Sequence, residues 1–171
     1  MAINKKDPVK QELKELFNEG MLMTLKDVTS FLDMTRSALQ QQIDRGNLVE
    51  IYGWNLGKTM YRLFYYPDII AFKKYHDTKK KNDTYEVYHK QIQTSERYRV
   101  QQLLRDNVWT ANQTRQHLGV TLATLNRHVK SGRLNVLYQT TAYRAFRLFY
   151  IPDVKRFKVK FDMYSDYMKR K

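Results

Sequence analysis

The feature that most constrains this chain is an internal repeat. The segment TLKDVTSFLDMTRSALQQQIDRGNLVEIY, which starts at Thr24, aligns without a gap with TANQTRQHLGVTLATLNRHVKSGRLNVLY, which starts at Thr110. After a one-residue deletion the alignment resumes, with YRLFYYPDIIAFK opposite FRLFYIPDVKRFK. Such self-similarity indicates repeated structural units. We therefore expect two copies of one small module within the 171 residues, with a loop at the deletion.

Each copy begins with a predicted pair of short helices. In the first copy Thr24 is an N-cap candidate, because a Thr hydroxyl can accept a hydrogen bond from a free amide at a helix start. A tight turn follows at Asp33-Met34, and Thr35 then caps a second helix. Leu39 and Ile43 lie on the inward face of that helix, at the i, i+4 spacing of an amphipathic helix. The equivalents in the second copy are Thr110, Gly119-Val120, Thr121, Leu125 and Val129.

A hairpin is predicted after the second helix, which Gly46 ends in the manner of a C′ glycine. Residues 48–52 (LVEIY) and 60–66 (MYRLFYY) are rich in the aromatic and branched side chains that favour strands. Pro67-Asp68 then predicts the start of another helix. The second copy has Gly132, residues 134–138 and 145–151, and Pro152-Asp153 at these places. The predicted fold class is α+β and mainly helical, with a small hairpin in each module.

These residues resemble the winged helix-turn-helix of MerR-type regulators and phage excisionases. The resemblance rests on MTRSALQQQIDRGNL and YPDIIAF in the first copy, and on VTLATLNRHVKSGRL and IPDVKRF in the second. It implies two tandem winged helix-turn-helix domains that bind double-stranded DNA. Members of this family typically carry one module and pair it with another, whereas this chain holds two. We therefore expect a monomer with two DNA-reading modules.

A helix-like lead-in precedes each copy, over residues 7–19 and 95–106. The predicted domains are therefore residues 1–77 and 95–171, each a module with its own lead-in helix. The linker between them, residues 78–94, opens with a polar, basic stretch that is typical of a hinge. Residues 84–104 also fit one long helix that would fix the spacing of the modules, and the sequence leaves both interpretations open.

The resemblance places the DNA-reading side chains on the second helix of each pair. In a winged helix this helix enters the major groove and presents residues near its N-terminus to base edges. Arg can bind guanine O6 and N7, and Gln or Asn can bind adenine N6 and N7, each pair discriminating by ~1–3 kcal/mol. The alternative is an ordinary solvated helix face. The outward positions are Arg36, Ser37, Gln40, Gln41 and Asp44 in the first copy, and Leu122, Ala123, Asn126, Arg127 and Lys130 in the second. Asp44 is unsuited to reading and Leu122 is expected to turn inward, so both are left out of the predicted recognition set.

The hairpin tips are the predicted wings, which commonly reach phosphates or the minor groove. Trp54 is also a candidate to cover the core of its own module. For the two strand arginines, phosphate contact is the first interpretation and pairing with a carboxylate such as Asp27 is the alternative. The predicted wing and strand contacts are Trp54, Asn55, Lys58 and Arg62 in the first copy, and Tyr143, Arg144 and Arg147 in the second.

The charge supports a polyanionic partner. Lys and Arg number 31 against 17 Asp and Glu, which gives a net charge of +14, and such an excess favours nucleic acid. The absence of Cys excludes disulfides and Cys-ligated zinc, and the four histidines show no ligand spacing. His117, which aligns with Phe31, is expected to pack within its module. We expect no metal and no cofactor.

Two further patterns bear on catalysis and location. GWNLGKT, at residues 53–59, is one residue too short for a phosphate-binding loop and precedes a predicted strand, so no enzymatic activity is expected. The N-terminus lacks the apolar core of a signal peptide, and no stretch approaches the roughly 18 apolar residues of a membrane span. A cytoplasmic, nucleoid-associated protein without a membrane role is the expectation.

The leading functional hypothesis is sequence-specific binding of double-stranded DNA, as a transcriptional regulator that occupies an operator. A second hypothesis is an architectural role on DNA in recombination directionality, replication, or plasmid or phage partition. A third, of another class, is a basic protein-interaction module with an acidic protein partner.

Overall fold

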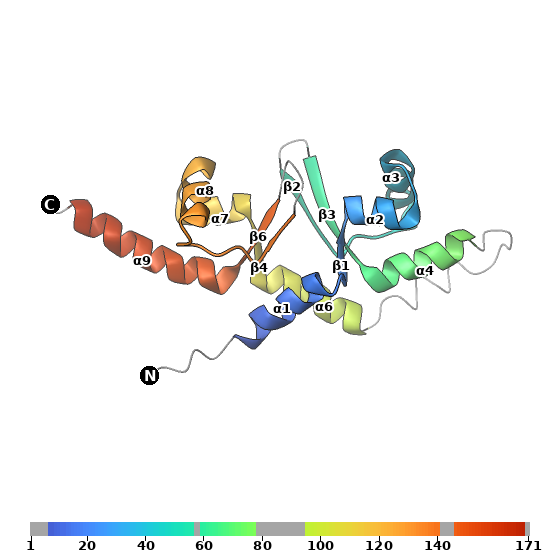
Figure 1. Cartoon of the computed structure of the whole chain (residues 1–171), viewed down its shortest axis with the longest axis horizontal. Helices are drawn as coiled ribbons and strands as arrows, with labels where there is room; N and C mark the ends of the chain where they lie inside the picture. The colour runs from blue at the N-terminus through green and yellow to red at the C-terminus, as the bar shows by residue number, and fades with distance from the viewer. Residues whose placement is uncertain (1–6, 57–58, 78–94, 141–145, 170–171) are drawn as a thin grey trace. The chain divides into compact units, whose positions relative to one another are not determined.

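The computed structural model describes residues 7–56, 59–77, 95–140 and 146–169. The same order of elements occurs twice (Figure 1). The first repeat consists of α1 (Pro8–Asn18), β1 (Leu22–Thr24), α2 (Leu25–Leu32), α3 (Arg36–Asp44), β2 (Tyr52–Leu56), β3 (Thr59–Tyr65) and α4 (Tyr66–Asp77). The second consists of α6 (Ser95–Asn107), β4 (Val108–Thr110), α7 (Ala111–Leu118), α8 (Leu122–Lys130), β5 (Tyr138–Gln139), β6 (Arg147–Tyr150) and α9 (Ile151–Lys169). The predicted α+β, mainly helical class and the lead-in helices are confirmed.

The cap residues begin the helix pairs as the sequence predicts. The Thr24 hydroxyl accepts from the Asp27 amide at 3.3 Å, and Asp27 Oδ2 accepts from the Thr24 amide at 2.8 Å. Thr110 and Gln113 form the same capping box in the second repeat. Because each member satisfies an amide that the helix leaves free, this motif fixes where α2 and α7 begin.

The turn between the paired helices requires a left-handed residue. Asp33 has φ 50° and ends α2, and Gly119 has φ 67° and ends α7. Thr35 and Thr121 then cap α3 and α8, accepting hydrogen bonds from the amides of Ala38 and Thr124. The predicted tight turns and second caps are therefore confirmed.

Each sheet has one strand more than the predicted hairpin. β1 pairs with β3 and β4 pairs with β6, giving antiparallel sheets of order β1-β3-β2 and β4-β6-β5. In these added pairs Thr24 lies opposite Leu63 and Thr110 opposite Leu148. The sequence did not indicate β1 and β4, because three residues between a turn and a helix cap are too few to show alternation.

The first strand of each hairpin begins later than predicted. β2 begins only at Tyr52 and β5 at Tyr138, although strands were expected over residues 48–52 and 134–138. Leu48 and Leu134 are buried in the cores instead. Their apolar character reflects packing under the helix pair and not pairing along the sheet.

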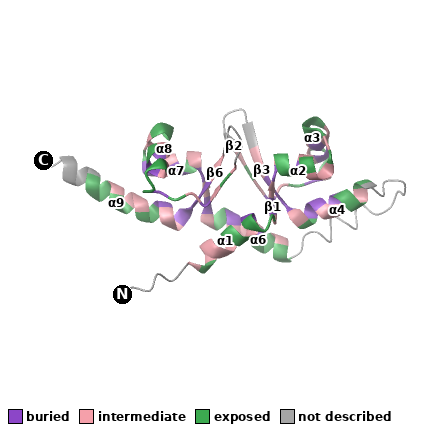
Figure 2. Ribbon diagram, viewed as in Figure 1, coloured by how far each residue is buried: buried purple, intermediate pink, exposed green. Residues whose placement is uncertain are grey.

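Each repeat has its own core (Figure 2). Leu39 of α3 and Leu125 of α8 are buried, and Ile43 and Val129 pack against the respective cores, as the helical spacing predicts. Since these residues hold one face of α3 and α8 inward, the opposite face of each helix is left for solvent or a partner. The core members are Val28, Leu39, Leu48, Phe64, Ile69 and Phe72 in the first repeat, and Leu118, Leu125, Leu134, Phe149 and Val154 in the second.

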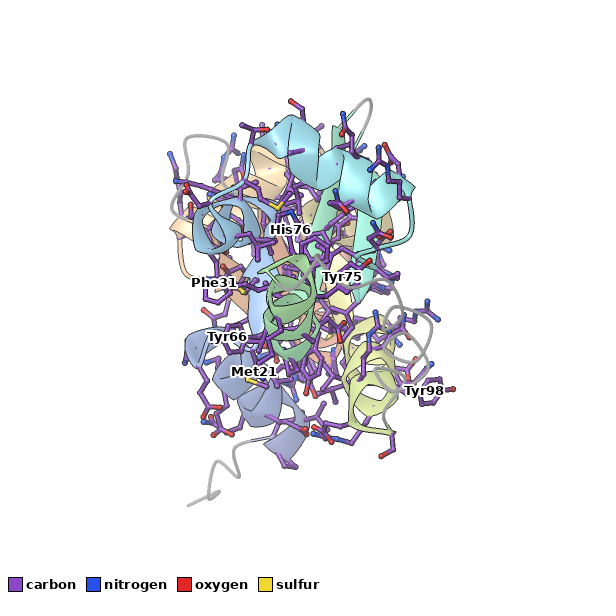
Figure 3. All side chains as sticks on the ribbon, turned by 90° about the vertical axis from the view of Figure 1, so that its right-hand side faces the viewer. Met21, Phe31, Tyr66, Tyr75, His76 and Tyr98 are labelled. Atoms are coloured by element: carbon purple, nitrogen blue, oxygen red, sulfur yellow. The ribbon has the colours of Figure 1, made fainter. Side chains whose placement is uncertain are left out.

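A contact between aromatic rings occurs near the C-terminal end of α2, and another near that of α7. Phe31 of α2 meets the Tyr66 ring edge-on, with ring centroids 5.7 Å apart (Figure 3). His117 takes the equivalent place on α7, with its ring 4.7 Å from that of Trp109. The prediction that His117 packs within its module is confirmed.

The chain divides into two compact units that do not follow chain order. One comprises residues 15–104, and the other comprises residues 1–14 together with 105–171. In the first unit Arg97 of α6 donates from Nε to Asp68 Oδ2 of α4 at 2.7 Å. In the second unit Lys10 of α1 pairs with Asp153 of α9. The start of each lead-in helix thus packs with the other repeat: the start of α6 with the first repeat, and the start of α1 with the second.

The residues of the predicted linker, 78–94, lie outside those described. The proposed domain boundaries at residues 77 and 95 therefore stay a prediction. In the described residues, Arg97 of α6 forms an ion pair with the first repeat, and Lys10 at the beginning of α1 forms one with the second.

Candidate nucleic-acid interface

The outer face of α3 carries the side chains that the sequence indicates. Arg36, Ser37 and Gln41 are exposed, and Gln40 is half-buried. Asp44 is also exposed, at the end of the helix. The inner face buries Leu39 together with Gln42. This placement agrees with the predicted set, whose role in binding stays a prediction.

The outer face of α8 is more basic. Ala123, Arg127 and Lys130 are exposed, and Asn126 is half-buried. The expectation that Leu122 turns inward is wrong, since 51% of this residue is exposed. Leu122 is the first residue of α8. The buried residues of this helix are Leu125 and His128, which form its inner face.

A strand arginine binds a helix amide in each repeat, and the sequence did not indicate this pairing. Arg62 Nη1 of β3 donates to Gln40 Oε1 of α3 at 3.0 Å. Arg147 Nη1 of β6 donates to Asn126 Oδ1 of α8 at 2.5 Å. In the repeat alignment Gln40 matches Asn126, and Arg62 matches Arg147. Because both copies keep an amide at one position and an arginine at the other, the alignment contained a signal for this pairing.

Both arginines had been expected to reach phosphate or a carboxylate such as Asp27. The carboxylate of Asp27 closes the capping box with Thr24. The guanidinium groups of Arg62 and Arg147 each donate to an amide of the recognition-helix candidates, and their contact with phosphate stays a prediction. They connect the hairpin to α3 and α8 and so fix the orientation of the amides there.

The further contacts of these groups differ between the repeats. Gln40 Nε2 donates to Asp44 Oδ1 at 2.6 Å, so its amide lies between a guanidinium and a carboxylate. In the second repeat Arg147 Nε donates to Gln139 Oε1 at 2.7 Å. The position of Asp44 is taken there by Lys130.

Aromatic side chains line the hairpin of the first repeat. Trp54 lies opposite Tyr61 in the strand pairing, and the two rings stack 5.7 Å apart at 11°. The ring of Tyr52 lies 5.5 Å from Trp54 on its other side along the strand. Trp54 therefore packs along the hairpin. In the second repeat the described contact is between Tyr138 and Phe146, at 5.8 Å.

Several predicted wing residues are not described. Lys58, Tyr143 and Arg144 lie outside the described residues, and Asn55 is placed in β2 without a described side chain. Their contacts with DNA stay predictions.

The inner faces of α3 and α8 each bury one polar residue. Gln42 Oε1 accepts from Asn47 Nδ2 at 2.7 Å. At the aligned position His128 is buried, and neither ring nitrogen has a hydrogen-bond partner among the described residues. Its ring lies edge-on to Phe157 and Phe161, with centroids 5.0 and 5.4 Å away. Burial, followed by the nearby charges of Arg133 and Arg127, lowers the pKa of His128, which favours the neutral imidazole.

The described residues show no cluster of three or more His, Asp or Glu arranged to hold a metal ion. None of the described helices combines the length and the apolar character that crossing a membrane requires. Comparisons with models of known protein families, with curated proteins and with solved structures found no significant match.

Proposed function

We propose that this chain binds double-stranded DNA sequence-specifically through two tandem winged helix-turn-helix modules, without catalysis. In this proposal α3 and α8 enter the major groove, and the hairpins β2–β3 and β5–β6 act as wings. Occupation of an operator, and thereby control of transcription, is the biological role that we assign. The resemblance to MerR-type regulators and excisionases motivates this assignment.

One observation carries the proposal: the same presentation of a polar helix face occurs in both repeats. In each, a Thr cap fixes the start of the second helix, a Leu buries its inner face, and a strand Arg binds an amide on its outer face. A rigid helix with oriented polar side chains suits base readout in the major groove. The net charge of +14 favours a polyanionic partner.

The experiment selects bound duplexes from a random pool with the intact chain, then titrates the selected and a scrambled duplex at physiological salt. The intact chain is required because the start of α6, which carries Arg97, belongs to the same compact unit as the first repeat. A cut between residues 78 and 94 would divide this unit. We expect saturable binding of the selected duplex and a clear preference over the scrambled one.

The matched variants are Arg36→Ala and Arg127→Ala, with Arg105→Ala as an exposed arginine on α6 for control. Each recognition-helix variant should lose ~1–3 kcal/mol on the selected site, whereas the control should bind as the unchanged protein does. Equal binding of selected and scrambled duplexes would favour an acidic protein partner instead. Sequence-specific binding at recombination, replication or partition sites would favour the architectural role.

A further inference from the structure

The amide of Asn126 has a forced orientation. A guanidinium carries only hydrogen-bond donors, so the group that faces Arg147 Nη1 must be the amide oxygen, 2.5 Å away. The same reasoning applies to Gln139, whose Oε1 faces Arg147 Nε at 2.7 Å. Each amide therefore has its NH₂ group left for another partner.

These NH₂ groups are available. No described residue accepts a hydrogen bond from Asn126 Nδ2 or Gln139 Nε2. Gln139 is exposed, and Asn126 and Arg147 are half-buried. Arg147 thus engages the oxygen of both amides, and the NH₂ donors are the groups without a described partner.

The first repeat has the opposite character. Gln40 uses its oxygen toward Arg62 and its nitrogen toward Asp44, so both ends of its amide are engaged. The exposed group next to it is the Asp44 carboxylate, which when ionised only accepts hydrogen bonds. The second repeat therefore presents the NH₂ donors of Asn126 and Gln139, whereas the first repeat presents the carboxylate acceptor of Asp44.

We propose that Asn126 reads the edge of a guanine in the major groove, with Arg147 as its positioning residue, and that Asp44 reads the amino group of a cytosine in the other half of the site. Guanine presents two adjacent acceptors, O6 and N7, whereas adenine places a donor next to its acceptor. An amide whose oxygen is held by Arg147 and whose NH₂ group faces the base matches guanine. This inference rests on the proposed function and replaces two expectations: that Asn126 binds adenine with both ends of its amide, and that Asp44 is unsuited to reading a base.

The decisive variant is Asn126→Asp, which keeps the size of the side chain and its acceptor toward Arg147 while replacing the outward donor with an acceptor. Duplexes are selected from a random pool with the intact protein and with this variant. At one position we expect the preference to change from guanine to cytosine, and affinity for the original site to fall about 5–150-fold, the equivalent of 1–3 kcal/mol. Asn135→Asp, in the exposed segment after α8, is the control for the added charge.

Two further variants separate positioning from mere stability. Arg147→Ala frees the Asn126 amide to rotate, so adenine should become accepted at the guanine position. Asp44→Asn should weaken the cytosine preference in the other half-site and leave the guanine position unchanged. Asn126→Ala, which has no polar group, should lose the guanine preference without gaining cytosine, even if the Asp variant does not fold.

Failure of this inference is distinguishable from failure of the proposed function. If the unchanged protein selects no duplex, DNA binding itself is wrong. If it selects one but Asn126→Asp weakens binding to all sequences equally, and to the same extent as Asn135→Asp does, the effect is that of the added charge alone and the inference is overturned. Unaltered base preference in Arg147→Ala would overturn the positioning role.

Discussion

The two repeats share a skeleton but differ in the chemistry that they present. Thr caps, a left-handed turn residue and a buried Leu recur at matching positions of α2–α3 and α7–α8. The outer faces diverge, with Asp44 in the first repeat where the second has Lys130. The residues shared by the copies thus determine the backbone, whereas the residues that differ determine which side-chain chemistry each repeat presents on its outer helix face.

The ion pairs that the lead-in helices make also differ. Arg97 and Asp68 have side chains only 12% and 7% exposed. Lys10 and Asp153 are 24% and 15% exposed, and Asp153 also pairs with Arg156. The pair in the first repeat is thus the more deeply buried one, whereas the second repeat shares the Asp153 carboxylate between two cations.

The largest expected effect is that of salt on DNA binding. If both repeats contact phosphates, roughly 6–10 contacts should weaken binding by about 10³–10⁵-fold between 50 and 200 mM salt. Lys130, the last residue of α8, and Arg45, the C-cap of α3, are both exposed. Lys130→Ala and Arg45→Ala should each reduce the slope of log affinity against log salt by about 1. Titrations over a salt series measure this. A slope changed by only one of them would show that only that repeat reaches the backbone.

The next effect is on stability. Asp68→Ala leaves Arg97 buried without its carboxylate and should cost about 3–5 kcal/mol in the free energy of unfolding. Asp153→Ala should cost less, because Lys10 and Arg156 are more exposed. Urea unfolding monitored by circular dichroism measures both. The control is Asp162→Ala, whose exposed pair with Lys158 should contribute no more than about 1 kcal/mol. Equal losses for all three variants would refute the proposed difference between the repeats.

A smaller effect is expected in the hairpin of the first repeat. Trp54→Ala removes the stacking with Tyr61 and should destabilise this unit by about 0.5–1.5 kcal/mol beyond the lost apolar burial. Tyr138→Ala provides the equivalent in the second repeat, where the rings of Tyr138 and Phe146 are tilted at 54°. Thermal unfolding of both variants compares the two hairpins. A larger loss for Tyr138→Ala would reverse the comparison.

The last prediction concerns the dependence of stability on pH, which is expected to appear only on the acid side. Because the pKa of His128 is lowered in the folded protein, the unfolded chain takes up a proton more readily. Stability should therefore be fully present above the ordinary His pKa of 6.5 and decline as the pH falls below it. His128→Phe, which fits the aromatic surroundings, should remove this part of the decline in urea unfolding measured across pH 7.5 to 5. A decline of the same size in the variant would exclude His128 as its cause.

The sequence predicted what depends on neighbours along the chain. The caps at Thr24 and Thr110, the turns at Asp33 and Gly119, and the inward face of α3 each follow from a few consecutive residues. The repeat alignment made these local signals stronger, since each appears twice.

The sequence did not predict what depends on tertiary contacts. β1 is only three residues long and is a strand because β3 pairs with it. Arg62 and Gln40 are separated by 22 residues. Arg97 lies on α6, the lead-in helix of the second repeat, yet it binds Asp68 of the first. These contacts require the fold to exist before the side chains meet, so no local pattern indicates them.

The most direct test of the two-module account is the stoichiometry of the intact chain on its selected duplex, with each half of the site scrambled in turn. The account predicts one chain per duplex and two related but unequal halves. Scrambling either half should weaken binding at least tenfold, because two linked contacts reinforce each other. A perfect palindrome occupied by two chains, or unchanged affinity after one half is scrambled, would contradict it.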